Sequence, residues 1–377
     1  MHNARAATWP EPGSWVICHL SLLRYNSPRG EAEASPLYGE EFNLKRWQFW
    51  LGILVSTVFL LWALQGLDLK QVFTYLQHGN YLWLIPSVAV YFLAVLVRTW
   101  RWDYLLRPLK RIPIKRLFPV VVIGYMGNNI FPFRIGELLR AYVLKRNEDV
   151  SISSSLATIV VERIFDGLTM LLFVFIALPT VPALPDSLRY IVIVGGVLFL
   201  GALVVFLFLA AKPTVAARLY NPFIDHLLPQ RYGVKLRGFI ERFILGLAAL
   251  RDVRQVFMIF FTSILIWLLE TVKYWFVMHA FQMDLSFFTL MLMNGIVNLS
   301  TTLPAAPGYI GTFDAPGIAV LVAFNVAREL ATAYTLVLHA ALWLPITLLG
   351  FYYMIREGLH WSDMTKASHL RESEPTP

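Results

Sequence analysis

The ten residues Asn128–Glu137, NNIFPFRIGE, interrupt an otherwise apolar stretch that covers residues 117–144. Two adjacent amides, a proline, an arginine and a glutamate are unusual neighbours in so apolar a chain. Hydrocarbon cannot hydrogen-bond the backbone groups that a proline frees, so such a break inside a bilayer needs polar side chains close by. The stretch therefore predicts a reversal of the chain within a membrane, if the whole chain is a membrane protein.

The composition supports that condition. Hydrophobic residues make up 57% of the 377 residues and charged residues 15%, which lies outside the range of soluble domains. The run from Tyr190 to Ala211 contains no charge and is long enough for a helix that crosses the hydrocarbon core. We predict an all-α polytopic protein, integral to a bacterial or archaeal cytoplasmic membrane.

The basic residues predict how the chain is oriented. Seven Lys or Arg lie between Arg98 and Arg116, and eight lie between Lys212 and Arg254. In contrast, the segment LPTVPALPDSLRY contains one Lys or Arg, and the segment QMDLSFF contains none. Because cytoplasmic loops are enriched in Lys and Arg, the basic segments and both termini are expected inside. This placement accounts for the net charge of +8 without a nucleic-acid partner.

Apolar runs predict about six transmembrane helices, at residues 47–65, 81–98, 154–178, 190–211, 255–281 and 332–355. Two apolar stretches remain, 117–144 and 287–327, and neither can cross an odd number of times. The first enters with about a dozen apolar residues, which reach roughly 18 Å, half of a bilayer. We predict a re-entrant helical hairpin there. The second is a hairpin from the outer side or two full crossings.

The order of these segments predicts an inverted repeat, with halves at residues 81–178 and 255–355. Each hairpin breaks at similar residues, namely Pro132 and Gly136 in the first and Pro304, Pro307, Gly308 and Gly311 in the second. The whole transmembrane domain would cover 44–360, with a cytoplasmic loop at 212–254. The polar segments 1–43 and 361–377 are expected to be a disordered cytoplasmic leader and tail.

Ionised residues in the predicted spans indicate a polar cavity, because each costs at least a few kcal/mol at the bilayer centre unless it is paired or hydrated. The candidates for binding a substrate are Asn128, Asn129, Arg134, Glu137, Arg140, Glu162, Arg163, Asp166 and Asp314. Glu137 and Arg140 lie three residues apart on one helical face, so we expect an ion pair between them. The alternative is that the asparagines only cap broken helices.

Four further charged residues are secondary candidates: Arg98, Arg101, Glu270 and Lys273. The two arginines end the second predicted span. They either snorkel towards the cytoplasmic headgroups or bind a lipid phosphate through their planar guanidinium groups. His279 and His339 are expected to be hydrogen-bonded helix residues rather than metal ligands.

The chemistry that the sequence lacks narrows the function. Its one cysteine, Cys18, excludes an internal disulfide and a thiolate metal cluster. The patterns G-x-x-x-x-G-K-[ST], H-E-x-x-H and G-x-S-x-G are absent from the sequence, so ATP hydrolysis, zinc proteolysis and nucleophile-elbow acyl transfer have no visible carrier. We expect no metal and no cofactor.

Four segments carry a resemblance to a known family: RTWRWDYLL, GYMGNNIFPFRIGELLRAYVL, VERIFDGLTMLL and LPAAPGYIGTFDAPGIAVL. In this order and spacing they resemble the membrane region of lysylphosphatidylglycerol synthases and the related stand-alone flippase-like proteins. The resemblance covers roughly residues 45–355, and Asn128–Arg140 is its most specific part. Asp314 stands where the family commonly has glutamate, and Tyr309 where a second glycine is frequent. These departures concern the substrate more than the fold.

The resemblance implies a lipid flippase that moves a head-modified phospholipid, such as aminoacyl-phosphatidylglycerol, or a polyprenyl-phosphate-linked lipid between leaflets. Membrane lipids would be its partners. Synthase activity is not expected, because that activity belongs to a separate soluble domain. Two alternatives stay open: a membrane partner or anchor of a separate glycosyl- or aminoacyl-transferase, and a lipid-modifying transferase with Glu137 or Asp166 as base. The sequence does not predict the oligomeric state.

Overall fold

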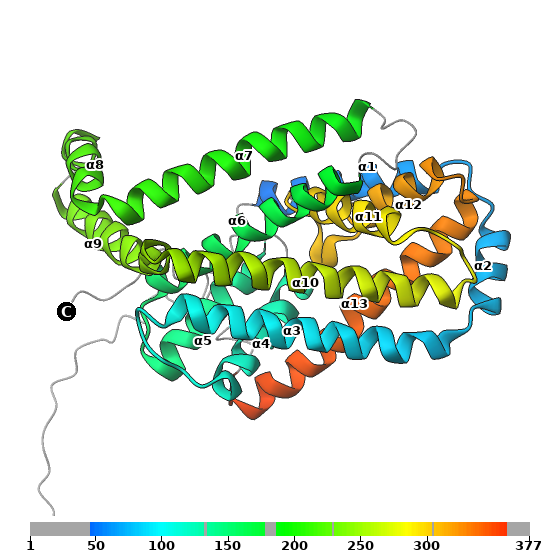
Figure 1. Cartoon of the computed structure of the whole chain (residues 1–377), viewed down its shortest axis with the longest axis horizontal. Helices are drawn as coiled ribbons and strands as arrows, with labels where there is room; N and C mark the ends of the chain where they lie inside the picture. The colour runs from blue at the N-terminus through cyan, green and yellow to red at the C-terminus, as the bar shows by residue number, and fades with distance from the viewer. Residues whose placement is uncertain (1–45, 132–133, 178–185, 228–229, 304, 360–377) are drawn as a thin grey trace, which may run out of the picture. The chain divides into compact units, whose positions relative to one another are not determined.

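The computed structural model describes residues 46–131, 134–177, 186–227, 230–303 and 305–359. Every regular element in these ranges is a helix (Figure 1). The all-α prediction is therefore confirmed for the described part of the chain. The predicted leader 1–43, the tail 361–377 and the hairpin residues Pro132 and Pro304 lie outside the described residues.

The α-helices of the first half are α1 (Arg46–Leu64), α2 (Leu69–His78), α3 (Leu84–Leu106), α4 (Ile114–Ile130), α5 (Ile135–Glu148), α6 (Ile152–Ala177) and α7 (Asp186–Ala211). Those of the second half are α8 (Pro213–Leu227), α9 (Gln230–Gly246), α10 (Val253–Ala280), α11 (Phe287–Ser300), α12 (Asp314–Ala323) and α13 (Arg328–Arg356). Short 3₁₀ turns are η1 (Tyr81–Trp83), η3 (Leu247–Arg251) and η4 (Pro307–Tyr309).

Three described helical segments are long and apolar enough to cross a membrane. They are Tyr81–Leu106, Val253–Ala280 and Arg328–Arg356. A fourth is counted if Leu200–Ala211 and Pro213–Pro222, which meet at 97°, form one bent span. Helix α6 is 26 residues long but carries three charges in its middle. The described residues therefore contain three clear apolar spans, or up to four.

Helices α3 and α10 run antiparallel and pack against each other along their length (Figure 1). The amide of Asn80, just before α3, donates to the carbonyl of Ala280 at 2.8 Å, where α10 ends. Farther along, the guanidinium of Arg101 donates to the hydroxyl of Ser263 at 2.7 Å. Because α3 continues to Leu106, both arginines of the secondary set lie within the helix rather than at its end.

The predicted chain reversal near residue 134 is present, as α4 and α5 form an antiparallel helical hairpin, the first hairpin. Their backbones touch at Gly136, where an added Cβ would lie 2.0 Å from the carbonyl oxygen of Gly124 and 2.4 Å from the amide of Asn128. Small residues allow such close approach between helices. Gly136 therefore holds the two arms together, in addition to its predicted place near the break.

A second hairpin consists of α11, the connecting residues 301–303 and 305–313, which include η4, and α12, and its tip reaches the first hairpin. At this tip Gly308 has a φ of +70°, and a Cβ there would lie 2.9 Å from the indole nitrogen of Trp343 and 3.4 Å from the carbonyl oxygen of Asn129. The tip thus lies against both α13 and the end of α4. Two segments about 170 residues apart in sequence meet here, as the contact from Arg134 to Thr301 also shows.

The apolar core is divided into two clusters. One contains the second half of α6 together with α11, α12 and the first half of α13. The other contains α4, α5, the first half of α6 and the end of α13. Helices α6 and α13 pass from one cluster into the other, and most of the buried charged residues lie near that transition.

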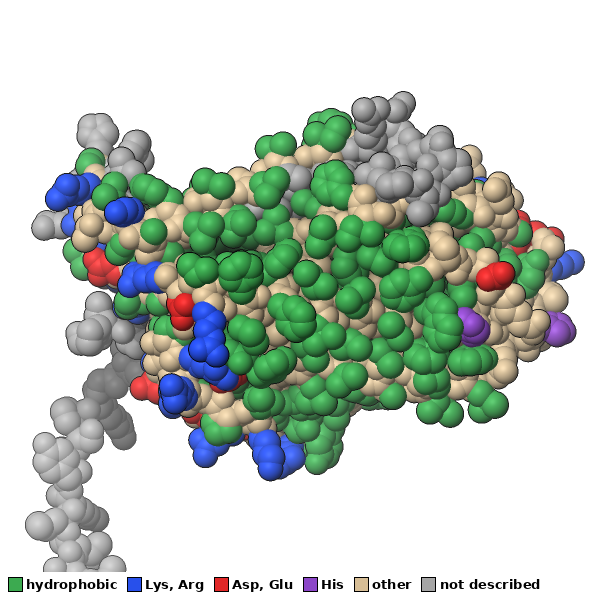
Figure 2. Space-filling model, in the orientation of Figure 1, with side chains coloured by type: hydrophobic (Ala, Val, Ile, Leu, Met, Phe, Trp, Pro, Cys, Tyr) green, Lys and Arg blue, Asp and Glu red, His purple; other side chains and the backbone are tan. Residues whose placement is uncertain are grey.

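The surface also has two regions. In the face seen in Figure 2, apolar side chains cover the middle, and Lys and Arg gather mainly at the end where α8 and α9 lie. Large apolar side chains such as Leu82, Val197, Phe257 and Ile355 are more than two-thirds exposed. An exposed apolar belt of this kind suits contact with lipid rather than with water.

The contact at Gly136 predicts that Gly136→Ala disrupts the first hairpin. The new methyl group would overlap backbone atoms that cannot rotate away, and overpacking of this kind costs about 1–3 kcal/mol or more. We expect a lower thermal unfolding midpoint in detergent, together with aggregation on size exclusion. Gly201→Ala is the matched control, because a Cβ at Gly201 meets no atom within 4 Å. Equal midpoints for the two variants would contradict the close approach.

Candidate functional site

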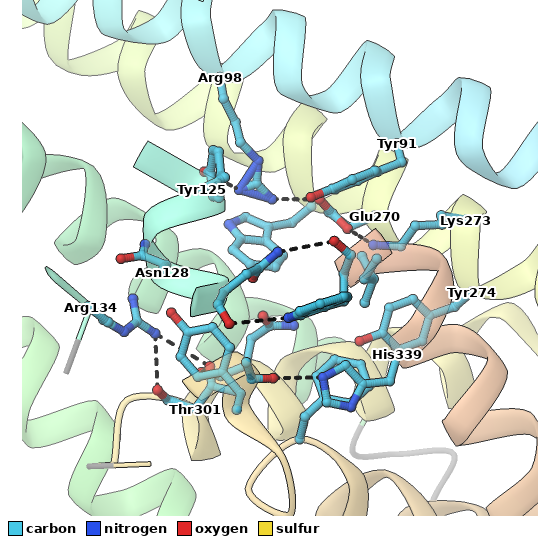
Figure 3. A pocket seen from close by; sticks show the side chains of 18 of the residues that line it. Tyr91, Arg98, Tyr125, Asn128, Arg134, Glu270, Lys273, Tyr274, Thr301 and His339 are labelled. Carbon is cyan, nitrogen blue, oxygen red and sulfur yellow. Dashed lines mark hydrogen bonds and ion pairs between the residues drawn. The ribbon is translucent and has the colours of Figure 1, made fainter. Parts of the chain in front are cut away.

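A polar cavity of about 130 Å³ lies where the two hairpin tips meet (Figure 3). Eight of the predicted site and hairpin-break residues line it: Asn128, Asn129, Arg134, Arg163, Arg98, Glu270, Lys273 and Gly308. His339 lines it as well. Glu137, Arg140, Glu162, Asp166, Asp314 and Arg101 are not part of its lining. The two hairpins and helices α3, α6, α10 and α13 each contribute to its wall.

One wall of the cavity carries a triad of charges. The guanidinium of Arg98 contacts the Glu270 carboxylate, with 2.7 Å between Nη2 and Oε1. The Lys273 ammonium pairs with the other oxygen of the same carboxylate. Arg98 also stacks on the ring of Trp267, 4.9 Å from its centroid. Arg98 is buried, so the prediction that it snorkels to the headgroups is wrong.

Next to this triad lies a second set of buried ion pairs, since the Trp267 indole that contacts Arg98 also donates a hydrogen bond to Asp166 at 2.9 Å. Arg140 binds Glu162 through two hydrogen bonds, of 2.7 and 3.3 Å, and its guanidinium covers the ring of Trp102 at 3.5 Å. Arg101 binds Asp166 with 2.5 Å between Nη1 and Oδ1. The expected pair between Glu137 and Arg140 is therefore corrected: Arg140 points across to α6. Arg101 is fully buried as well and does not snorkel.

Glu137 joins these pairs to the cavity. Its Oε1 atom lies 3.5 Å from Nη1 of Arg134 and 3.5 Å from Nε of Arg163. Arg163 in turn lies 3.5 Å from Oδ2 of Asp166. These contacts are longer than the pairs deeper inside, and the side chains of Arg134 and Arg163 are each 26% exposed. Of the three arginines that line the cavity, Arg134 and Arg163 are thus less tightly paired with carboxylates than Arg98.

Positive charge is in excess in this network. The charged side chains that the contacts above connect are Arg98, Arg101, Arg134, Arg140, Arg163 and Lys273 against Glu137, Glu162, Asp166 and Glu270. Six cations and four carboxylates leave two positive charges over. Five of the six cations are arginines, which do not lose their proton in proteins, so the excess of positive charge favours a bound anion. The cavity is suited to a phosphate or carboxylate group.

The two hairpin tips contact each other and α13 through side chains of the predicted set. The Asn129 amide donates to the hydroxyl of Thr347 at 2.9 Å, and the Trp343 indole donates to the Asn129 carbonyl at 3.3 Å. The Arg134 guanidinium donates to the carbonyl of Thr301 at 3.1 Å and lies 5.5 Å from the ring centroid of Tyr309. Asn129 therefore joins α4 to α13, and its side chain does not act as a cap of the broken helix.

Asp314 occupies a separate position, behind His339. Its Oδ2 atom accepts a hydrogen bond from the Gly311 amide at 2.9 Å. Its Oδ1 atom lies 2.8 Å from Nδ1 of His339, whose Nε2 lies 2.7 Å from the carbonyl oxygen of Gly308. The interpretation of His339 as a hydrogen-bonded helix residue is confirmed. Asp314 reaches the cavity only through this histidine.

Sequence reasoning missed the aromatic residues of the cavity. Tyr91, Tyr125, Trp267, Tyr309 and Trp343 line it, and Tyr125 accepts a hydrogen bond from Arg98 at 3.2 Å. Aromatic residues form 15% of the chain, so their presence alone is no signal. The spacing of Trp267, Glu270 and Tyr274, three and four residues apart on α10, is a signal, because it places a charge between two aromatic rings on one helical face.

An all-helical chain with long apolar spans, a lipid-facing surface and ionised residues inside is an integral membrane protein. The chain belongs to the family described as the lysylphosphatidylglycerol synthase TM region, whose family model matches residues 49–350. The resemblance found in the sequence is therefore confirmed at the level of the family.

Relatives of the chain are archaeal membrane proteins. A UPF0104 membrane protein of Methanocaldococcus jannaschii is 25% identical over 313 residues, which cover 80% of this chain and 93% of that protein. Another UPF0104 membrane protein, from Methanothermobacter thermautotrophicus, is 25% identical over 325 residues, which cover 82% of this chain and 92% of that protein. Glycosyltransferase AglD of Haloferax volcanii is 25% identical over 79% of this chain but only 52% of its own length. No solved structure matches the chain.

The buried pair between Arg140 and Glu162 predicts that Glu162→Gln is strongly destabilising. Removing one partner leaves a buried cation without its counter-charge, which costs about 3–5 kcal/mol. We expect a clearly lower unfolding midpoint in detergent. Asp149→Asn is the control, since it also removes an ion pair, with Lys145, but at an exposed position, and its midpoint should equal that of the wild type. A Glu162→Gln midpoint that also equals the wild type would show that the pair does not stabilise the fold.

Proposed function

We propose that this protein moves an anionic or head-modified phospholipid, or a polyprenyl-phosphate-linked lipid, between membrane leaflets. One observation carries the proposal: the excess of two positive charges around a cavity inside a membrane protein. A lipid phosphate group supplies the missing negative charge. The headgroup would enter the cavity while its apolar chains stay in the bilayer.

Arginine side chains are suited to the recognition of that phosphate. Arg98, Arg134 and Arg163 line the cavity, and guanidinium groups bind phosphate through parallel hydrogen bonds. Among the residues described, the Nε atoms of Arg98 and Arg163 are buried without a hydrogen-bond partner. Buried donors are normally satisfied. A bound headgroup and its water would supply the acceptors.

The topology that we propose has six membrane spans and two re-entrant hairpins in an inverted repeat. The first repeat would contain α3, the first hairpin and α6, and the second would contain α10, the second hairpin and α13. Two observations support it: α3 and α10 run antiparallel, and the two hairpin tips meet at one cavity. Inverted repeats often place a substrate site near the bilayer midplane in this way. The end rich in Lys and Arg would face the cytoplasm, and we propose the same side of the membrane for both termini.

Movement of the headgroup would follow from movement of one hairpin against the other. The first hairpin is held together by backbone contacts at Gly136, so it would move as a unit. Its contacts with the second hairpin are single hydrogen bonds and a ring contact, which break at lower cost. The sequence carries no P-loop motif, so the movement would run downhill or use an ion gradient.

A second candidate function is favoured by one comparison. A relative is named glycosyltransferase AglD, and this chain matches about half of its length. A protein of this family could therefore act as the membrane partner of a transferase for lipid-linked sugars. In that case the cavity would hold the lipid phosphate while a separate protein modifies the headgroup.

Arg134→Gln and Arg163→Gln should each slow the movement of fluorescent phosphatidylglycerol in reconstituted vesicles. Loss of one charge-assisted hydrogen bond, worth about 1.5–3 kcal/mol, corresponds to a rate of lipid movement that is lower by roughly tenfold or more. The rate is measured from the accessibility of the label to a reductant added outside. Arg116→Gln is the control, because it removes the same charge from a largely exposed side chain outside the cavity.

The outcomes of this experiment separate the candidate functions. Movement of unchanged lipid that depends on Arg134 supports translocation. A new lipid product without any partner would indicate a transferase instead. Neither movement nor product, across phosphatidylglycerol and a polyprenyl phosphate, would favour the role as a membrane partner.

The proposed topology predicts opposite labelling at two exposed positions, Asn147 in the last turn of α5 and Asp284 after α10. In a chain without its native cysteine, Asp284→Cys should react with an impermeant maleimide added to intact cells, and Asn147→Cys only after lysis. Labelling of both positions from the same side would contradict the inverted arrangement.

A further inference from the structure

The hydrogen bonds of His339 determine how many protons it shares with Asp314. The carbonyl oxygen of Gly308 can only accept, so the Nε2 atom of His339, 2.7 Å away, must carry a proton. The Nδ1 atom faces the Asp314 carboxyl group at 2.8 Å. A hydrogen bond there needs a second proton, either on the ring or on the carboxyl oxygen. With the second proton at either position the pair is neutral overall, and it holds one proton more than a neutral histidine beside an aspartate anion.

Loss of that proton would weaken the contact between the second hairpin tip and α13. The single remaining ring proton is most favourable on Nδ1, facing the Asp314 carboxylate, because the attraction is strong where water is scarce. The Nε2 lone pair would then face the carbonyl oxygen of Gly308, and the two would repel each other. Gly308 lies against Trp343 and Asn129. The second tip would therefore lose a bond at the place where it touches the first hairpin.

The same proton also alters the charge of the cavity. Besides Asp314, the ionisable groups that line the cavity with His339 are Arg98, Arg134, Arg163, Glu270, Lys273 and the tyrosines. With its proton bound, the Asp314–His339 pair is neutral and the network retains its two excess positive charges. Without the proton, one negative charge is added and one positive charge remains in excess. An anionic headgroup therefore binds better when the pair is protonated, and by reciprocity the headgroup favours protonation.

We propose that Asp314 and His339 form a proton-binding site that couples movement of the lipid headgroup to a proton gradient. This inference rests on the proposed translocation. A proton from the water on one side binds to the pair, crosses together with one anionic headgroup, and leaves to the water on the other side. For a phosphodiester lipid with one negative charge, this combined movement carries no net charge.

The experiment uses the whole protein in vesicles that contain a trace of fluorescent phosphatidylglycerol. A gradient of one pH unit is buffered across the membrane, and the ratio of label between the two leaflets is measured at steady state. One proton per lipid predicts a ratio of roughly ten, since one pH unit corresponds to 1.36 kcal/mol. The ratio should be the same with and without a potassium diffusion potential, and protein-free vesicles give the background.

Variants assign the coupling to the pair. Asp314→Asn and His339→Gln each remove one partner of the proposed proton-binding pair with little change of shape, so the ratio between leaflets should fall to about one in each. His279→Gln is the matched control, because it removes a histidine whose Nδ1 only contacts a carbonyl of its own helix, that of Trp275. It should keep the wild-type ratio. Correct folding of each variant is checked by its unfolding midpoint.

Three results would overturn the inference, and they differ in what they leave standing. Lipid that moves but distributes equally under the gradient would exclude coupling and retain translocation. A gradient-dependent ratio that persists in both Asp314→Asn and His339→Gln would place the proton elsewhere. Absence of any lipid movement, with or without a gradient, would remove the proposed function together with the coupling.

Discussion

The structure depends on the pairing of arginine with carboxylate inside a membrane protein. An ionised side chain in a bilayer is costly alone, so each buried arginine requires a partner from another part of the chain. Arg98 requires α10 and Arg101 requires α6, both across long sequence distances. Arg140 ties the first hairpin to α6. These pairs determine which helices lie together around the cavity, and apolar packing fills the two clusters on either side.

Much of this arrangement follows from local sequence. Helix type, the reversal between α4 and α5, and the presence of interior charges are visible in NNIFPFRIGE and VERIFDG, because breaks and charges in apolar segments have few physical explanations. Arg134, Arg163 and Asn129 were expected at a shared cavity, and they line it. Gly136 was expected near a break, where in fact its lack of a side chain allows two backbones to touch.

The partners of those charges could not be predicted in the same way. Spacing along one helix favoured Glu137 for Arg140, but the stronger pair is with Glu162, since two hydrogen bonds in the interior outweigh a neighbour on a partly exposed face. Arg98 and Arg101 were placed at a helix end because apolar character stops at residue 98, whereas the helix continues to Leu106. The position of Arg98 in the sequence does not show that the carboxylate of Glu270, on α10, lies beside it. The aromatic side chains around the cavity are likewise hidden by the general abundance of such residues.

The backbone at the meeting point of the hairpins has one further consequence. Arg134 and Tyr309 stand opposite each other, one from each tip, and both have a left-handed conformation, with φ of 54° and 61°. Residues with a Cβ hold this conformation at a cost of about 1–3 kcal/mol each. The backbone is therefore strained on each side of the junction, and the contacts that the two side chains make there must outweigh that cost in the folded protein.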